Sequence, residues 1–182
     1  MTGDGKPAFT IIGLPDTACR QAPDRIRAAA TNCKLKMPRE KITVNLSPAN
    51  LTKQGSGYDL AIAMATLATR DDVDAALIRG VVHLGELGLD GTLRPVNAVL
   101  PAVLAARAAG VKTVVVPVAN AREAGLVEGI EVVPAASLDT LVARYKAMRR
   151  RWRLPGRPRR TWCLRASPRC GRTWSAPLPG RG

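Results

Sequence analysis

The 182-residue sequence is poor in the side chains that most enzymes use for chemistry. It has one histidine, His83, and aromatic residues make up only 3% of the chain. None of its four cysteines, Cys19, Cys33, Cys163 and Cys170, lies in a C-x-x-C pair. A structural zinc site needs four Cys or His ligands at characteristic spacings, so the sequence offers poor material for one, and we expect reduced thiols.

Long apolar runs and phosphate-binding loops are also missing. No apolar stretch approaches the ~20 residues that span a bilayer, and the N-terminus lacks a basic-then-apolar signal pattern. The sequence contains no G-x-x-x-x-G-K-[ST] loop, and Gly85, Gly88 and Gly91 do not have the G-x-G spacing of a dinucleotide loop. We therefore predict a cytoplasmic location, no membrane partner and no nucleotide site within this chain.

The formal net charge of +14 is concentrated at the C-terminal end. Residues 149–182 contain eleven arginines, no lysine and no acidic residue, whereas the other residues hold 17 basic and 14 acidic side chains. We predict a folded domain over residues 1–147 and a disordered tail, rich in Arg, Pro and Trp, over residues 148–182. The arginines predict that the tail binds nucleic acid through phosphates and supplies most of the binding at low salt, with Arg149, Arg150 and Arg151 among the candidate contacts.

Hydrophobic periodicity in residues 1–147 predicts alternating strands and helices. Strands are predicted at 9–12, 42–46, 113–117 and 131–133, and helices at 26–33, 60–68, 99–106, 120–126 and 137–145. Two further strands, 81–85 and 92–96, are predicted to form a hairpin around Asp90-Gly91. Asn120 and Ser137 are predicted N-caps, and the run 70–74 is predicted to end a helix in solvent. The expected fold is α+β (alternating α/β), with a mixed sheet and packed helices.

Four side chains are candidates for acid–base or nucleophilic chemistry. Ser56, between two glycines at a loop-to-helix junction, has the setting of an activated nucleophile, but no base has a recognisable spacing to it, and a flexible turn is the simpler interpretation. Asp59 and Glu86 would serve as an acid–base pair only if the fold brought them together. His83, among valines and a leucine, is interpreted as a buried core residue.

A basic cluster, Lys34, Lys36, Arg39 and Lys41, is the densest group of cations in residues 1–147. A solvated face is the simpler interpretation of such a group. Contact with nucleic acid is the alternative, because the rest of this part is nearly charge-balanced and supplies little attraction for phosphates.

Three stretches of the sequence together resemble one known family. They are 12–29 (IGLPDT followed by DRIRAA), 41–63 (KITVNLSPA followed by GSGYDLAIA) and 85–96 (GELGLDGTLRPV). The resemblance is to the N-terminal domain of the YifB/ComM family of magnesium-chelatase-like AAA+ ATPases, and it covers residues 7–145 in order. The residues that carry it are Gly13, Leu14, Pro15, Asp16, Arg25, Arg27, Asn45, Pro48, Ala49, Gly55, Asp59, Leu60, Gly85, Glu86, Leu87, Gly91, Arg94 and Pro95.

This resemblance implies a ribosomal-protein-like fold, similar to the Lon protease C-terminal domain. It implies a domain that works beside an ATPase module in hexamers that drive DNA branch migration during natural transformation. ATP and magnesium would bind in that module, so no cofactor is expected in this chain, and its partners would be the module, further copies and DNA. Relative to the family the sequence begins late and ends before the module, so we expect a truncated domain with a frameshift-derived tail.

The similarity to Lon also implies where a catalytic Ser–Lys dyad would lie. Aligning the helix that starts near Asp59 places Gly57, and not Ser56, at the nucleophile position, and Leu100 at the lysine position. Glycine cannot attack and leucine cannot activate a nucleophile. The sequence therefore predicts a non-catalytic accessory domain that acts in DNA processing. A Lon-related serine peptidase that uses Ser56 and a stand-alone basic DNA-binding protein are the alternatives.

Overall fold

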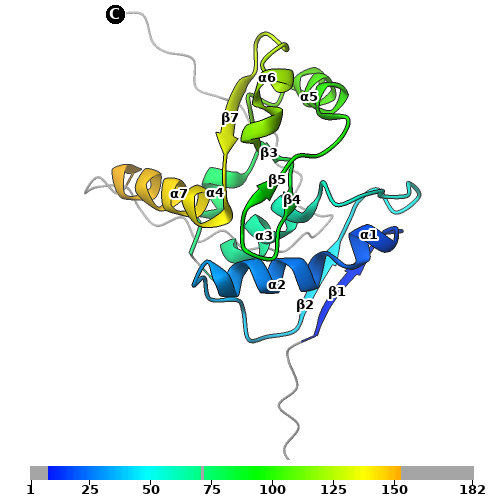
Figure 1. Ribbon diagram of the computed structural model, residues 1–182, viewed down its shortest axis with the longest axis vertical. Helices are drawn as coiled ribbons and strands as arrows, with labels where there is room; N and C mark the ends of the chain where they lie inside the picture. Colours follow the sequence, from blue (N-terminus) through cyan, green and yellow to red (C-terminus); the bar gives the residue numbers. More distant parts are fainter. Residues whose placement is uncertain (1–7, 71, 153–182) are drawn as a thin grey trace, which may run out of the picture. The chain divides into compact units, whose positions relative to one another are not determined.

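The computed structural model describes residues 8–70 and 72–152 (Figure 1). Strands and helices alternate along these residues, and their order confirms the predicted α+β class. The elements are β1 (Phe9–Ile12), α1 (Thr17–Arg20), α2 (Ala22–Asn32), β2 (Ile42–Asn45), α3 (Asp59–Ala68), α4 (Ala75–Ile78), β3 (Val81–His83), β4 (Glu86–Leu87), β5 (Leu93–Arg94), α5 (Val99–Ala108), β6 (Thr113–Pro117), the 3-10 turn η1 (Val118–Asn120), α6 (Ala121–Ala124), β7 (Glu131–Ala135) and α7 (Leu138–Trp152).

Parallel and antiparallel pairings are both present, as the prediction of mixed pairing required, and they are distributed over three small sheets. β3, β6 and β7 form a parallel three-stranded sheet in the order β3-β6-β7, and β1 pairs in parallel with β2. β4 and β5 form an antiparallel hairpin. β6 is the central strand of its sheet, which explains its continuous apolar sequence TVVVP, because such a strand is buried on both faces.

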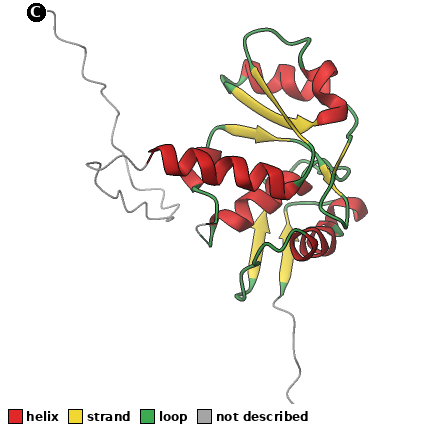
Figure 2. Ribbon diagram, turned by 60° about the vertical axis from the view of Figure 1, so that its left-hand side comes forward, coloured by secondary structure: helices red, strands yellow, loops and turns green. Residues whose placement is uncertain are grey.

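Helices cover both faces of the three-stranded sheet, which Figure 2 shows edge-on between them. Val115 and Val133 face a first core to which α2, α3 and α7 contribute. Val114 and Val116 face a second core to which α5 and α6 contribute. Alternate residues of a strand point to opposite faces, so one short strand supplies both cores.

Helix α3 is the most buried helix of the first core. Leu60, Ala63, Met64 and Leu67 on its buried stripe are fully inaccessible to solvent. Their spacing of three or four residues places them on one face, which confirms the stripe predicted from the sequence.

His83 is the last residue of β3, and its side chain is buried against Tyr145 of α7, which confirms its interpretation as a buried residue. It is 7% exposed, and its Nε2 lies 2.9 Å from the hydroxyl of Tyr145. Burial lowers the pKa of His83 to about 4, so the ring is neutral at pH 7. Its role is therefore a polar contact within the core.

The predicted hairpin forms around Asp90-Gly91, but its first strand was wrongly assigned. Its first strand is Glu86–Leu87, whereas Val81–His83 pairs in parallel with β6. The backbone of Gly85 separates the two strands: its N–H donates to Gly57 O (3.1 Å), and its carbonyl accepts from Leu60 N–H (3.1 Å). These hydrogen bonds direct the chain toward the start of α3. The residues after Gly85 therefore no longer pair with β6 and pair with β5 instead.

The run 70–74 was wrongly predicted to lie entirely in solvent. Val73 is 1% exposed and packs in the first core, and Asp74 caps the short helix α4 that follows. A single apolar residue inside a charged run was the missed signal, because it anchors a segment whose polar neighbours stay at the surface.

The structure also differs from the predictions in the side-chain contacts of the two N-cap residues, Asn120 and Ser137, and at the domain boundary after residue 147. The side chain of Asn120 binds the backbone N–H and C=O of Val96, both at 3.0 Å, and makes no cap. Ser137 does hold the N-cap position of α7, since its carbonyl accepts from the Leu141 N–H at 3.2 Å, but its hydroxyl donates to the carboxylate of Asp139. α7 continues to Trp152, past the boundary predicted at residue 147, and the rest of the predicted tail lies outside the described residues.

Candidate functional site: the start of helix α3 and a basic groove

A buried ion pair joins two of the family-motif residues at the start of α3. Arg25 of α2 donates to the Asp59 carboxylate through Nε (2.6 Å) and Nη2 (2.9 Å), and Asp59 is fully buried. The Leu87 N–H donates to the same carboxylate at 3.3 Å. Burial raises the pKa of Asp59, and the Arg25 guanidinium opposes that rise. The pair therefore holds α2, α3 and β4 together.

A second motif carboxylate, Asp16, ties the turn after β1 to the loop before α3. It accepts from the backbone N–H of Cys19 (2.7 Å), which caps α1, and of Gly55 (2.8 Å). These donors lower the pKa of Asp16. Gly13 begins the turn with φ +102°, and a Cβ there would overlap the Leu46 carbonyl oxygen, so only glycine fits. Asp16 therefore has a structural role.

The buried side chain of Lys53 binds backbone carbonyl groups of the same loop. It is 5% exposed, and its ammonium group donates to the carbonyl oxygens of Pro48 and, at 2.8 Å, Leu51. A buried ammonium group is stable only where such acceptors replace its water. The ammonium group thus cross-links the loop over residues 48–53.

Ser56 donates a hydrogen bond to the Glu86 carboxylate. The structure thus brings Asp59 and Glu86 to the same end of α3, but the hydrogen bonds of the two carboxylates go to different partners, Arg25 and Ser56. Within the described part of the chain, neither a histidine nor a lysine is hydrogen-bonded to Ser56. The Ser56 hydroxyl is thus held by the Glu86 carboxylate.

The two positions that the resemblance aligns with the Lon dyad, Gly57 and Leu100, make structural contacts. The Gly57 carbonyl accepts from the Gly85 N–H at 3.1 Å. The amide of Leu100 donates to Glu123 Oε1 at 2.9 Å, and the Leu100 side chain packs against the second core.

The remaining motif residues surround this network. Pro15 pairs with Lys53 in an isolated parallel bridge. The guanidinium of Arg27 lies 5.6 Å from the centre of the Phe9 ring. The others are exposed (Leu14, Asn45, Pro48, Ala49, Arg94 and Pro95) or buried (Leu60, Gly85, Leu87 and Gly91).

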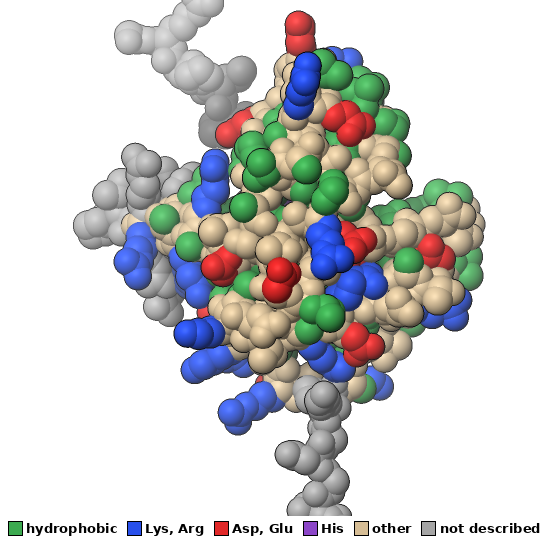
Figure 3. Space-filling view, in the orientation of Figure 1, with side chains coloured by type: hydrophobic (Ala, Val, Ile, Leu, Met, Phe, Trp, Pro, Cys, Tyr) green, Lys and Arg blue, Asp and Glu red, His purple; other side chains and the backbone are tan. Residues whose placement is uncertain are grey.

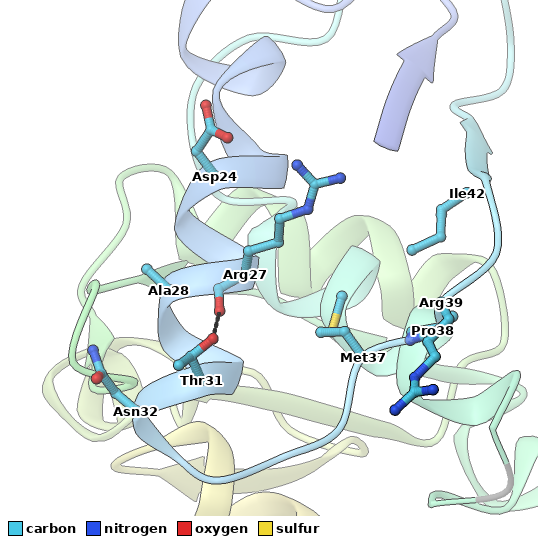
Figure 4. Close-up of a pocket in the computed structure, with 9 residues that line it drawn as sticks. All are labelled: Asp24, Arg27, Ala28, Thr31, Asn32, Met37, Pro38, Arg39 and Ile42. Carbon is cyan, nitrogen blue, oxygen red and sulfur yellow. Dashed lines mark hydrogen bonds between the residues drawn. The ribbon is translucent and has the colours of Figure 1, made fainter. Parts of the chain in front are cut away.

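A groove of about 690 Å³ lies between α2 and the segment that leads into β2. Its α2 side is lined by Asp24, Arg27, Ala28, Thr31 and Asn32, and its other side by Met37, Pro38, Arg39 and Ile42. In Figure 4, Met37 lies between Arg27 on one side and Arg39 on the other. The groove therefore combines an apolar centre with a cation at each side.

A second hollow, of about 530 Å³, continues from the groove and shares Met37 and Arg39 with it. Its other lining residues are Lys36 and Arg70. Asp72 links Arg70 to α7, because its carboxylate lies 3.9 Å from Arg70 Nε and 3.2 Å from Lys146 Nζ. The two hollows and the end of α7 thus belong to one surface.

Helix α7 extends this surface, because Arg149 and Arg150 follow Lys146 at the three- and four-residue spacing of one helical face. In Figure 3, Lys and Arg side chains gather along the left and lower left of the visible face, over α7 and the segment after α2. We call this surface the basic track; its members are Arg27, Lys36, Arg39, Arg70, Lys146, Arg149 and Arg150.

The basic track contains part of each predicted nucleic-acid cluster. Lys36 and Arg39 line the hollows, whereas Lys34 and Lys41 are exposed on the same segment without lining them. Arg151 belongs to α7, but its side chain lies outside the described part of the structure. Sequence reasoning missed Arg70 and Lys146: the spacing from Lys146 to Arg150 was a usable signal, but nothing in the sequence marks Arg70.

Within residues 8–70 and 72–152, no three His, Cys, Asp or Glu side chains are grouped so that they would hold a metal ion. No helix in the same part has the length and apolar character needed to cross a membrane.

Comparison of the sequence with those of known proteins identifies its family. The profile of the family described as "Subunit ChlI of Mg-chelatase" matches residues 1–120. An uncharacterized protein of Mycobacterium tuberculosis is 47% identical over 137 residues, which is 75% of this chain and 27% of that protein. Competence protein ComM of Haemophilus influenzae is 44% identical over 124 residues (68% and 24%), and YifB of Escherichia coli 38% over 139 residues (76% and 27%).

These matches define a magnesium-chelatase-related domain. The chain belongs to the YifB/ComM family, of which it represents the N-terminal domain. It spans about a quarter of the length of the curated relatives it matches. Lon protease 2 of Syntrophobacter fumaroxidans is 32% identical over 103 residues, 54% of this chain and 12% of the protease, consistent with the expected Lon-like fold.

Proposed function

We propose that this chain is a non-catalytic accessory domain of a magnesium-chelatase-like ATPase and that it contributes to DNA processing by contacting DNA. One relative carries the name Competence protein ComM. The ATPase module, further copies of the chain and DNA are the partners that the family resemblance implies. ATP hydrolysis belongs to the module in this proposal, because the chain's own sequence has no phosphate-binding loop with its lysine.

The contacts at the start of α3 support a non-catalytic role. Each charged group there already has a structural partner: Arg25 binds Asp59, Asp16 caps α1, and Lys53 closes its loop. The Ser56 hydroxyl faces the Glu86 carboxylate without a lysine or histidine partner among the described contacts. A peptidase that uses Ser56 is therefore the weaker candidate function.

The basic track is the observation that carries the proposed DNA contact. It joins α2, the segment before β2, the turn after α3 and helix α7, which are far apart in the sequence. Carboxylates also lie along it: Asp24 lines the groove, Glu40 follows Arg39 in the sequence, and Asp72 is paired with Arg70 and Lys146. A line of cations releases counterions from DNA phosphates, which is the main source of sequence-independent affinity.

A charge-neutralising variant tests this contact. The background is the full-length chain with the eight arginines after Trp152 exchanged for glutamine, so that the tail does not mask the domain. Exchange of the four exposed track residues Lys36, Arg39, Lys146 and Arg150 for glutamine is expected to weaken DNA binding about tenfold or more near 100 mM salt. The salt slope, that of log affinity against log salt concentration, should decrease in magnitude by about one for each phosphate that the variant no longer neutralises. Fluorescence anisotropy with labelled DNA measures both quantities.

A matched control removes the same charge elsewhere. Four exposed cations away from the track, Arg20, Arg107, Lys112 and Arg122, are exchanged for glutamine in the same background. This control should keep most of the affinity and the salt slope. Equal losses in both variants would show that net charge alone attracts DNA, and no binding by the background chain would reject the proposed DNA contact.

A further inference from the structure

We propose that the groove between α2 and β2 binds single-stranded nucleic acid, with unstacked bases on its apolar floor and phosphates on the arginines at its sides. This inference rests on the proposed DNA contact, and it adds the form of the strand and the residues that select it.

The floor of the groove provides a surface for bases. Met37 and Ile42 are half-buried, and Ala28 and Pro38 extend the apolar lining. A thioether makes favourable contacts with aromatic rings, and base faces are available to such contacts only when the bases are unstacked. A duplex keeps its base faces inside the stack, so it would contact the cationic sides and leave this floor unused.

The sides of the groove provide a path for the phosphates. Arg27 is held in place by its position over the Phe9 ring, and Arg39 lies across the groove from it (Figure 4). A guanidinium group binds phosphate with two parallel donors and also stacks on a base. Asp24, one helical turn before Arg27, repels phosphate and marks one end of the path. Beyond the other end, Lys36 and Arg70 continue the cations into the second hollow.

An acidic peptide with a large apolar side chain would present similar chemistry to the groove itself. Two features favour a nucleic-acid strand. The cations continue past the groove over the turn after α3 to α7, as a regularly charged backbone requires. Thr31 and Asn32 of α2 also line the groove. The Thr31 hydroxyl donates to the Arg27 carbonyl (2.8 Å), and Asn32 Nδ2 donates to the Leu89 carbonyl (2.7 Å). The side-chain oxygens of Thr31 and Asn32 are therefore the atoms that would accept hydrogen bonds from base edges.

The test exchanges floor residues without changing charge. The full-length chain with glutamine at the eight arginines after Trp152 is compared with its Met37→Ser and Ile42→Thr variants. Affinities are measured for a thymidine single strand of about twenty nucleotides and for a duplex of the same length. Each floor variant is expected to bind the single strand about tenfold more weakly, while its affinity for the duplex changes less than about twofold.

A control variant and a folding check separate the outcomes. Leu104→Ser, at an exposed position of α5 that does not line the groove, should leave both affinities unchanged, and circular dichroism confirms that each variant is folded. If Met37→Ser does not fold, Ile42→Thr and Met37→Gln provide the comparison. Equal losses for single strand and duplex, or no loss for either, would overturn the single-strand site and leave the proposed DNA contact standing.

Binding of neither nucleic acid by the parent chain would instead reject the proposed function itself. A glutamate-rich peptide that carries one leucine serves as the competing ligand. Tighter binding of this peptide than of the single strand, abolished in Met37→Ser, would assign the groove to an acidic peptide and overturn the inference.

Discussion

Exchange of Arg25 for methionine is expected to lower the free energy of unfolding by about 3–5 kcal/mol at pH 7. The Asp59 carboxylate is fully buried and receives two charge-assisted hydrogen bonds from Arg25. Methionine fills a similar volume but leaves that charge with the 3.3 Å hydrogen bond from Leu87 N–H alone. An uncompensated buried charge is among the few causes of so large a loss.

The effect of this substitution should depend on pH in a defined direction. Burial raises the pKa of Asp59 above 3.8, and Arg25 opposes the rise, so without Arg25 the pKa rises further. A carboxyl group with a raised pKa in the folded state binds more protons there than in the unfolded state. The stability of Arg25→Met therefore decreases as pH rises from about 3.8 through the folded-state pKa. The difference in the free energy of unfolding between the unsubstituted chain and Arg25→Met should be largest near pH 7 and smaller toward pH 4.

Urea denaturation at several pH values measures both effects. Arg20→Met, an exposed change in the neighbouring helix α1, is the matched control and should alter stability by less than about 0.5 kcal/mol. The double variant Arg25→Met with Asp59→Leu should recover part of the loss, because no buried charge remains. A loss below about 1 kcal/mol for Arg25→Met, or a difference that does not change with pH, would contradict a structural role for the pair.

Exchange of Met64 for aspartate is expected to abolish cooperative unfolding of the domain. Met64 is fully buried on the core stripe of α3, and an unpaired carboxylate there costs several kcal/mol, on the scale of about 5–15 kcal/mol that stabilises a whole domain. Ala65→Asp places the same charge on the exposed side of the same helix and should remain folded. Met64→Ala gives an intermediate case, with an expected loss of about 2–5 kcal/mol.

Thermal unfolding followed by circular dichroism distinguishes these variants. A soluble Met64→Asp protein with a cooperative transition near that of the unsubstituted chain would show that the core stripe of α3 is wrongly assigned. Loss of folding in Ala65→Asp as well would show that the helix, and not the buried face, is sensitive to charge.

The parts of the fold that were predictable from the sequence depend on local patterns. The stripe of α3 follows helical periodicity, and β6 is an uninterrupted β-branched run. The apolar run 81–85 was predicted to be the first strand of the hairpin, whereas that strand is β4, the neighbouring pair Glu86–Leu87. The separation of β3 from β4 depends on hydrogen bonds from Gly85 to the start of α3, about 25 residues earlier in the chain, which no local pattern encodes.

The candidate site was predictable only in part for the same reason. The family resemblance marked Arg25, Asp59 and Glu86, but their partners lie 30 to 34 residues away and follow from the packing of α2 and β4 on α3. The basic cluster was visible in the sequence through the density of lysines. Its extension to Arg70 and α7 depends on Asp72, which pairs with Arg70 in the turn after α3 and with Lys146 of α7.

Covalent labelling of Ser56 tests most directly whether the start of α3 is structural and not catalytic. The full-length chain is incubated with a fluorophosphonate probe, and the adduct is located by mass spectrometry of peptides, with Ser56→Ala as the control. We predict no adduct at Ser56, because its hydroxyl faces the Glu86 carboxylate and has no described lysine or histidine partner. A stoichiometric adduct at Ser56 in the folded chain that is absent from Ser56→Ala would contradict the non-catalytic assignment.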